Sequence, residues 1–306
     1  MDGGIIPLWK EKGVYSQRYI TQIRRLLDIK KVGHSGTLDP DVDGVLPVAF
    51  GCGTKVLEYM LDSDKKYQGS VTLGYSTTTE DASGDRVEHK ELGSHDLNDE
   101  RIDEVLSSFL GEIEQTPPMY SAVRVDGVRL YELARQNITI DRPSRKVTIF
   151  ALERTSPVKY DEKNKLFTFS FDVHCSKGTY IRTLAVDIGQ AMNIPSHMSS
   201  LTRIESAGIR AGQTYKMEEL IQAEEAGHLE ELILPIEDFL TSYDFLEVSQ
   251  DLSQRIKHGA QLNMNNFRDR KAEFPALLTY NKEALAVYEE NPKRPGWVKP
   301  LKMIRS

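Results

Sequence analysis

The sequence predicts a mixed α/β fold of the α+β kind, built on a largely antiparallel sheet. Helical and strand patterns follow one another without the steady strand–helix alternation that a parallel sheet requires. The clearest strand, residues 166–175, alternates apolar and polar side chains, as a strand with one solvent-facing side does. Neither a G-x-G-x-x-G run nor a phosphate-binding loop occurs, which disfavours a Rossmann fold.

The N-terminal half begins with a short strand at residues 5–8. A helix follows that Ser16 can cap, with an apolar stripe between residues 20 and 27. Apolar alternation, helical periodicity and turn residues then predict, in order, a strand at 45–50, a helix at 54–61, a strand at 67–75, a polar loop at 76–85, a helix at 102–110 closed by Gly111, a helix at 129–136 and a strand at 146–153.

The C-terminal half continues from the strand at 166–175 directly into a helix. An acidic helical stretch at 217–234 is broken by Pro235, and short strands and turns follow residue 245. This change of character predicts two domains, residues 1–243 and residues 244–306.

The composition excludes several classes of protein. With 306 residues, 39% of them hydrophobic, the chain can bury one large core and a small appendage. Its start lacks a basic region followed by an apolar stretch, and no run approaches 18 apolar residues, so we expect a cytoplasmic protein without membrane contact. Cys52 and Cys175 lack metal-ligand spacing, which favours reduced thiols that serve packing.

The net charge of −7 is unusual for a protein that binds a polyanion, but the charges are unevenly distributed. Residues 80–114 and 215–251 hold the acidic excess. Basic residues prevail at 1–35, 122–148 and 254–306. Each run alone could be a solvated helix face, whereas together the basic segments could line one groove.

The segment from Gly33 to Pro47 is the strongest candidate for chemistry. Gly36 and Gly44 permit backbone geometry that a Cβ would block, and Pro40 moves Asp39 out of the helical region, so the loop can present the Asp39 carboxylate to a ligand. An ordinary surface turn has the same composition. A calcium loop is a weaker alternative, because the twelfth position, where a glutamate should complete the shell, is Phe50.

Four ordered segments resemble the TruB family of bacterial tRNA pseudouridine-55 synthases. Residues 33–47 resemble the family's catalytic motif, with its aspartate at Asp39. The other three segments are 62–67, 119–122 together with 130–135, and 175–183. The resemblance covers about residues 1–210 and implies the pseudouridine synthase fold, with a small C-terminal PUA-like domain that binds RNA.

The family reaction isomerises uridine to pseudouridine in the T loop of tRNA, at position 55, and needs no cofactor and no metal. The resemblance implies that Asp39 is the nucleophile or base, in analogy to glycosidase carboxylates, that Arg182 pairs with it, and that Tyr67 stacks on the base and relays its C5 proton. His34 would fill the space that the extruded uridine leaves, and Leu201 and Tyr180 would contact the uracil. Candidate phosphate contacts are Lys10, Lys12, Arg24, Arg25, Lys31, Lys65, Lys66, Lys177 and the basic residues of the tail.

One segment departs from the family pattern. The family opens with Leu-Asp-Lys-Pro-x-Gly, whereas residues 8–13 keep the lysine, Lys10, and the glycine but not the aspartate or the proline. That segment is thought to support the catalytic loop. The departure leaves an alternative open, an RNA-binding chaperone that folds tRNA with weak or lost catalysis. A glycoside hydrolase using Asp39 with Asp41 or Asp43 is a third. We expect the tRNA T-arm stem-loop as the partner of a monomer that requires no protein partner.

Overall fold

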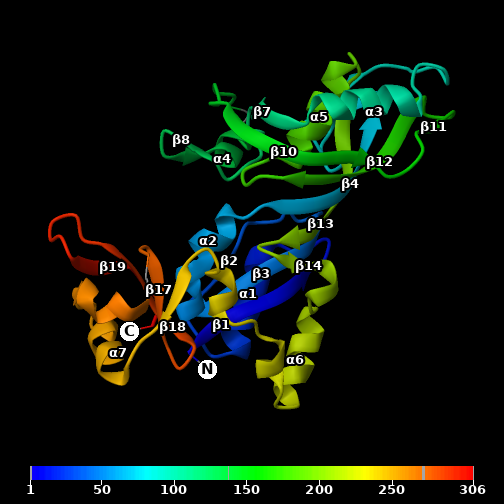
Figure 1. Ribbon diagram of the computed structural model, residues 1–306. Coiled ribbons are helices and arrows are strands. Elements are labelled where there is room, and N and C mark those ends of the chain that lie inside the picture. Colours follow the sequence, from blue (N-terminus) through cyan, green and yellow to red (C-terminus); the bar gives the residue numbers. More distant parts are fainter. Residues whose placement is uncertain (1, 137, 271–272, 306) are drawn as a thin grey trace.

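The computed structural model describes residues 2–136, 138–270 and 273–305 (Figure 1). Its largest element is a ten-stranded mixed sheet in which most neighbours are antiparallel and β13 pairs with β3 in parallel. The fold class predicted from the sequence is thereby confirmed. The strands of this sheet are β1 (Gly3–Lys10), β2 (Val32–His34), β3 (Asp43–Gly51), β4 (Lys65–Leu73), β7 (Gly111–Gln115), β10 (Arg145–Arg154), β11 (Lys159–Asp161), β12 (Leu166–Cys175), β13 (Ser196–Ser206) and β14 (Ile209–Arg210).

The long strands β4 and β13 join two parts of the molecule (Figure 1). On one side, β10 and β12 are covered by the helices α3 (Asp99–Ser108) and α5 (Ile181–Ala191), which share a core with them. On the other, β1 and β3 pack against α1 (Ser16–Leu26) and α6 (Met217–Glu225). The remaining helices are α2 (Leu57–Asp62), α4 (Leu130–Ala134) and α7 (Gln250–Lys257), and 3-10 turns occupy Cys52–Val56, Ala211–Gln213, Leu229–Leu232, Ile236–Phe239 and Met264–Arg270.

A separate five-stranded sheet follows residue 243. Its strands are β15 (Asp244–Glu247), β16 (Leu262–Asn263), β17 (Ala276–Tyr280), β18 (Glu283–Glu290) and β19 (Trp297–Met303). It has its own apolar core, and Leu277, Val287 and Ile304 join a second core that includes Val56 and Met60. Two small ribbons complete the fold, β5 (Tyr75–Thr77) with β6 (Arg86–His89), and β8 (Arg124–Val125) with β9 (Val128–Arg129). Among the described residues no helix is long and apolar enough to cross a membrane.

Sequence patterns account for the elements that carry the site. In β12 the apolar residues at odd positions from Phe167 to Cys175 are buried, whereas the polar ones between them are partly exposed. Asn98 caps α3 by accepting the Arg101 amide at 3.0 Å. Ser16 does not cap α1, contrary to the sequence prediction. Its hydroxyl instead exchanges hydrogen bonds with the backbone of Leu38, at 3.1 and 3.3 Å.

Candidate active site

The loop between β2 and β3 carries Asp39, and the segment around Lys10 and Gly13 forms hydrogen bonds to the backbone of this loop. Lys10 has no exposed surface, and its ammonium donates to the carbonyls of Pro40, at 3.0 Å, and Val42, at 2.6 Å. The amide of Gly13 donates to the Pro40 carbonyl as well, at 2.8 Å. The lysine and glycine that the divergent 8–13 segment retains are therefore the residues that support the loop, without the family's aspartate and proline.

Gly44 closes the loop where it enters the sheet. Its φ is +121°, and a Cβ would overlap the backbone of Arg203 in the neighbouring strand β13. Only glycine fits such a conformation beside such a close neighbour. The C-terminal half of the loop is thus anchored twice, by Lys10 at Pro40 and Val42 and by the contact of β13 with Gly44.

Arg182 connects the Asp39 loop with two other segments. Its Nε lies 3.1 Å from Asp39 Oδ2, and its Nη1 lies 3.9 Å from Asp81 Oδ2. Its other hydrogen bonds go to the carbonyls of Thr79, at 3.0 Å, and Tyr120, at 2.8 Å. The side chain is 7% exposed and lies in the first turn of α5, so the guanidinium has a fixed direction. Asp81, in the loop after β5, was not singled out from the sequence.

The Asp39 carboxylate is partly open to solvent, with its side chain 43% exposed. Lost hydration raises its pKa above 3.8, and Asp81 adds to this effect, whereas the positive charge of Arg182 opposes it. A carboxylate that keeps access to solvent beside a fixed guanidinium is suited to nucleophilic or base chemistry.

Tyr67 and Leu201 lie on one face of the sheet, next to the loop. Tyr67 pairs with Arg203 and Gly69 pairs with Leu201 in the β4–β13 ladder, so the side chains of Tyr67, Leu201 and Arg203 point to the same side. A Cβ at Gly69 would come within 3.0 Å of Leu201, so this position must be small. Burial raises the pKa of Tyr67, while the positive charge of Arg203 opposes the rise.

Arg203 is the second residue that sequence reasoning missed. It is 1% exposed and donates to the carbonyls of Val45, at 2.8 Å, and Gly36, at 3.1 Å. Nothing in its local sequence distinguishes it from a surface arginine. The alternation of β13 places it on the same side as Leu201, which is the only sequence signal that could have found it.

His34 lies near Arg203, and Tyr180 lies two residues before Arg182 in the chain. Burial lowers the pKa of His34, and its buried Nδ1 has no hydrogen-bond partner among the residues that the structure describes. Tyr180 precedes α5, and the side-chain amide of Gln115 binds its backbone N–H, at 3.0 Å, and its carbonyl, at 3.2 Å. The Arg145 guanidinium lies 4.9 Å from the centre of the Tyr180 ring.

The predicted phosphate contacts Lys10 and Lys65 are wrong, because both ammonium groups are turned inward. Lys65 is 8% exposed and donates to the carbonyls of Leu61, at 3.1 Å, and Ser63, at 2.5 Å, next to the end of α2. Burial lowers the pKa of each of the two lysines to about 8. Lys66 is half-buried and pairs with Glu205 at 3.1 Å, whereas Lys177 is exposed and pairs with Asp62 at 2.8 Å.

The other carboxylates of the loop do not converge on Asp39. Asp43 accepts a hydrogen bond from the Thr202 hydroxyl at 2.6 Å, and Asp41 is exposed. Within the described residues no group of three or more histidine, cysteine or acidic side chains is placed to hold a metal ion. This arrangement gives no support to the calcium-loop or paired-carboxylate alternatives.

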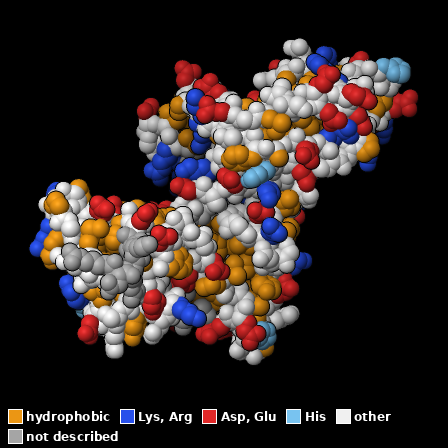
Figure 2. Space-filling model, viewed as in Figure 1, with side chains coloured by type: hydrophobic (Ala, Val, Ile, Leu, Met, Phe, Trp, Pro, Cys, Tyr) orange, Lys and Arg blue, Asp and Glu red, His pale blue; other side chains and the backbone are white. Residues whose placement is uncertain are grey.

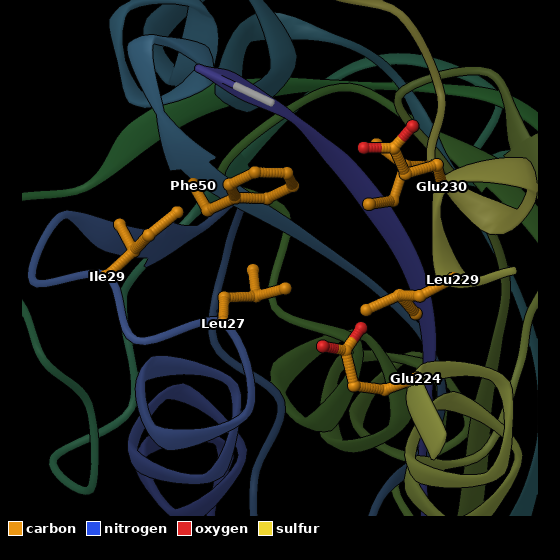
Figure 3. Close-up of a pocket in the computed structure, with 7 residues that line it drawn as sticks. Leu27, Ile29, Phe50, Glu224, Leu229 and Glu230 are labelled. Atoms are coloured by element: carbon orange, nitrogen blue, oxygen red, sulfur yellow. The ribbon is translucent and has the colours of Figure 1, made fainter. Parts of the chain in front are cut away.

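A cavity of about 160 Å³ lies elsewhere, where α1, β3 and α6 meet. Figure 3 shows the carboxylates of Glu224 and Glu230 beside an apolar surface that includes Phe50 and Leu27. Its lining includes none of the residues around Asp39. The candidate chemistry therefore belongs to the open surface beside Asp39 and not to this cavity.

Comparisons with known proteins show the family to which the chain belongs. Residues 24–181 match the N-terminal domain of TruB family pseudouridylate synthases, and residues 182–241 match the C-terminal domain of tRNA pseudouridylate synthase B. The chain is 48% identical to tRNA pseudouridine synthase B of Halalkalibacterium halodurans over 98% of its length and 97% of that protein. It is 41% identical to the same enzyme of Staphylococcus aureus, over 99% of this chain and 100% of that protein.

A solved structure, the crystal structure of a Cbf5-Nop10-Gar1 complex, contains a similar fold. Its matched chain has a TM-score of 0.66 and 25% identity, over 94% of this chain and 78% of that chain. The long match to the family model and the full-length relatives are decisive: the chain belongs to the TruB family of pseudouridylate synthases.

Proposed function

We propose that this protein converts uridine to pseudouridine in the T loop of tRNA, at position 55, with Asp39 as the nucleophile or base. The observation that carries the proposal is the ion pair of Asp39 with the buried Arg182, beside the face that bears Tyr67 and Leu201. The full-length relatives named tRNA pseudouridine synthase B support the substrate.

The reaction breaks the bond between N1 of uracil and C1′ of ribose and forms a bond between C5 and C1′. C5 loses a proton and N1 gains one, so no electrons are exchanged with a cofactor. Asp39 attacks the sugar, attacks the base or removes a ribose proton, and attack on the sugar has its analogy in the nucleophilic carboxylates of glycosidases. Arg182 keeps the carboxylate ionised and aimed, because its charge opposes the rise in the pKa of Asp39.

The target base must leave the RNA stack before Asp39 can reach its ribose. Extrusion costs on the order of a few kcal/mol. In the proposal Tyr67 stacks on the uracil and relays the C5 proton, Leu201 and Tyr180 contact the base, and His34 occupies the vacated space. The low pKa of His34 supports this role, because a neutral ring enters a base stack at lower cost than a charged one.

The RNA backbone would bind along the hollow between the segment that bears β8 and α4 and the C-terminal sheet. Figure 2 shows Lys and Arg side chains gathered below β8 and α4, on the side that faces this hollow. Arg124, Arg129 and Arg135 of that segment are exposed. Lys66 and Lys177 are further candidates that would exchange their carboxylate partners for phosphate. We assign catalysis to residues 1–243 and RNA binding to a PUA-like domain at 244–306.

The test is to incubate the protein alone with an unmodified T-arm stem-loop and to follow pseudouridine by nucleoside analysis. We expect stoichiometric conversion of the uridine at position 55, without added metal or cofactor, and none in a hairpin whose loop is scrambled. Binding without product would favour the RNA-folding chaperone. Release of free uracil would favour a glycoside hydrolase.

A further inference from the structure

Arg203 holds a buried positive charge whose hydrogen bonds go to neutral groups. In the part of the chain that the structure describes, its Nε and Nη2 donate to the carbonyls of Val45 and Gly36. Burying a guanidinium without a carboxylate is costly, so such a residue persists where its charge or its geometry has a use. The fold gives it two immediate neighbours, the Asp39 loop and Tyr67.

The first neighbour is the loop, which Arg203 grips on both sides of Asp39. Gly36 lies three residues before Asp39, and Val45 lies six residues after it. A guanidinium is a planar fork whose donors have fixed directions. Through these two carbonyls, the side chain fixes how far the loop stands from β13.

The second neighbour is Tyr67. Arg203 and Tyr67 are directly paired across β13 and β4, so their side chains start about 5 Å apart on the same face. The charge of Arg203 acts on the phenol, and so does that of Asp39. Lys10, Lys65 and His34 also sense the positive charge of Arg203, which places it at the centre of the buried groups beneath the loop.

We propose that Arg203 is a positioning residue of the reaction, whose guanidinium fixes the phenolic oxygen of Tyr67 relative to the Asp39 loop. This inference rests on the proposed function. Asp39 supplies the reacting carboxylate and Tyr67 contacts the base, and the base turns between the two halves of the reaction. One rigid side chain that binds both elements keeps the two functional groups in register while that happens.

The first experiment compares Arg203→Met with Arg305→Met. Arg305 is a matched control because its guanidinium is also largely buried and bonds to Glu237 and the Ala284 carbonyl, at the junction with the C-terminal sheet. We expect both variants to lose thermal stability. Only Arg203→Met should lose single-turnover rate on the T-arm stem-loop, by about 100-fold, with the Kd for RNA changed less than about threefold.

Arg203→Lys keeps the positive charge but loses the planar guanidinium with its fixed donor directions. This variant replaces Arg203→Met in the experiment if the methionine variant does not fold. We expect a rate reduced by about tenfold. Equal rates for Arg203→Met, Arg305→Met and wild type would overturn the proposal, and so would an Arg203→Lys variant as fast as wild type.

The second experiment separates action through Tyr67 from a general structural role. If Arg203 works by holding Tyr67, Arg203→Met combined with Tyr67→Phe should be no slower than Tyr67→Phe alone. Rates that fall by the product of the two single effects would show that the residues act independently and would overturn the proposal.

A third readout needs no activity. Protein labelled with 3-fluorotyrosine reports the ionisation of Tyr67 by fluorine NMR, with its signal assigned by its loss in Tyr67→Phe. The pH at the midpoint of the Tyr67 titration should rise in Arg203→Met, because the positive charge that favours the ionised phenol is lost. It should stay unchanged in Arg305→Met. An unmoved midpoint in Arg203→Met would refute the contact with the phenol. A wild-type protein that makes no pseudouridine would refute the proposed function and leave this measurement valid.

Discussion

At the scale of single residues, the site is organised by two buried arginines that act on two different groups. Arg182 pairs with Asp39, and Arg203 adjoins Tyr67. Each guanidinium also binds two backbone carbonyls, which fixes its direction. Charge that is held in place in this way needs little reorganisation during a reaction.

The ionisation of Asp39 gives the first prediction. Lost hydration raises its pKa and Arg182 lowers it, so removing the guanidinium in Arg182→Met should raise that pKa further. The reaction needs the ionised carboxylate, so activity falls as the pH drops through this pKa. The acid limb of the pH–rate profile should therefore move to higher pH in Arg182→Met. A profile that only scales down, without moving, would contradict the assignment.

The sequence predicted part of this site. The family motifs indicated Asp39, Tyr67, Arg182 and Leu201, and the structure brings Arg182 to Asp39 and puts Tyr67 and Leu201 on one face. The roles of Lys10 and Lys65 were predicted wrongly, because a basic side chain in a motif does not reveal whether its ammonium points to solvent or to buried carbonyls. Asp81 could not be predicted, since its closeness to Arg182 depends on how a polar loop folds over α5.

At the scale of elements, the contact of β13 with the start of β3 sets the place of the Asp39 loop. Gly44 has a positive φ and no room for a Cβ, whereas Gly208 has a φ of +76° and open space around it. This difference allows backbone strain and steric overlap to be separated.

Gly44→Ala should destabilise the protein by more than about 2 kcal/mol and lower activity, because the Asp39 loop must shift away from Arg203. Gly208→Ala should cost about 1 kcal/mol, from backbone strain alone, and leave turnover unchanged. Thermal unfolding and the stem-loop assay measure both effects. Equal losses in the two variants would show that overlap with β13 is unimportant.

Helix α5 contains a second testable carboxylate, Asp187. Burial and the charge of Glu80 raise the pKa of Asp187 to about 6. The folded protein therefore binds this proton more tightly than the unfolded chain, and stability falls as the pH rises from about 4 to about 6. Asp187→Asn should raise the free energy of unfolding at pH 7.5 by about 1–3 kcal/mol and change it little at pH 4. Denaturant unfolding at the two pH values tests this, and equal effects at both would contradict it.

Elements with strong patterns were predicted closely, and elements decided by tertiary contacts were not. The strand at 166–175 matches β12, since its alternation is unbroken. The helix predicted at 54–61 starts instead as a 3-10 turn at Cys52–Val56, and the acidic helix predicted to residue 234 ends at Glu225. Gly227 has a φ of +77° just beyond that end, so a glycine stops the helix before Pro235 can.

At the scale of the whole molecule, the acidic net charge is compatible with RNA binding because the charges are segregated. Arg124, Arg129 and Arg135 are exposed on the segment that bears β8 and α4, whereas the acidic residues of α6 lie in the other part of the molecule (Figure 1). The sequence showed these runs of charge but not which of them share a face. That depends on the paths of β4 and β13.

Replacing Arg124, Arg129 and Arg135 together by alanine should weaken stem-loop binding. It should also reduce the slope of log Kd against log salt by about 2, because each phosphate contact contributes roughly 0.7–0.9 to that slope. The matched control replaces Lys159, Lys163 and Lys165, which are exposed around the β11 hairpin. That triple variant should keep the wild-type slope. Similar slopes for both variants would show that RNA does not bind along the segment with β8 and α4.

Catalysis is assigned above all to one carboxylate, and Asp39→Asn tests this assignment directly. The measurement is the single-turnover rate of pseudouridine formation on a T-arm stem-loop, together with the Kd for the same RNA. We predict a rate at least about 1000-fold below wild type and a Kd within about tenfold of it, because binding rests on phosphate contacts and chemistry rests on the carboxylate. Turnover by Asp39→Asn at the wild-type rate would contradict the account.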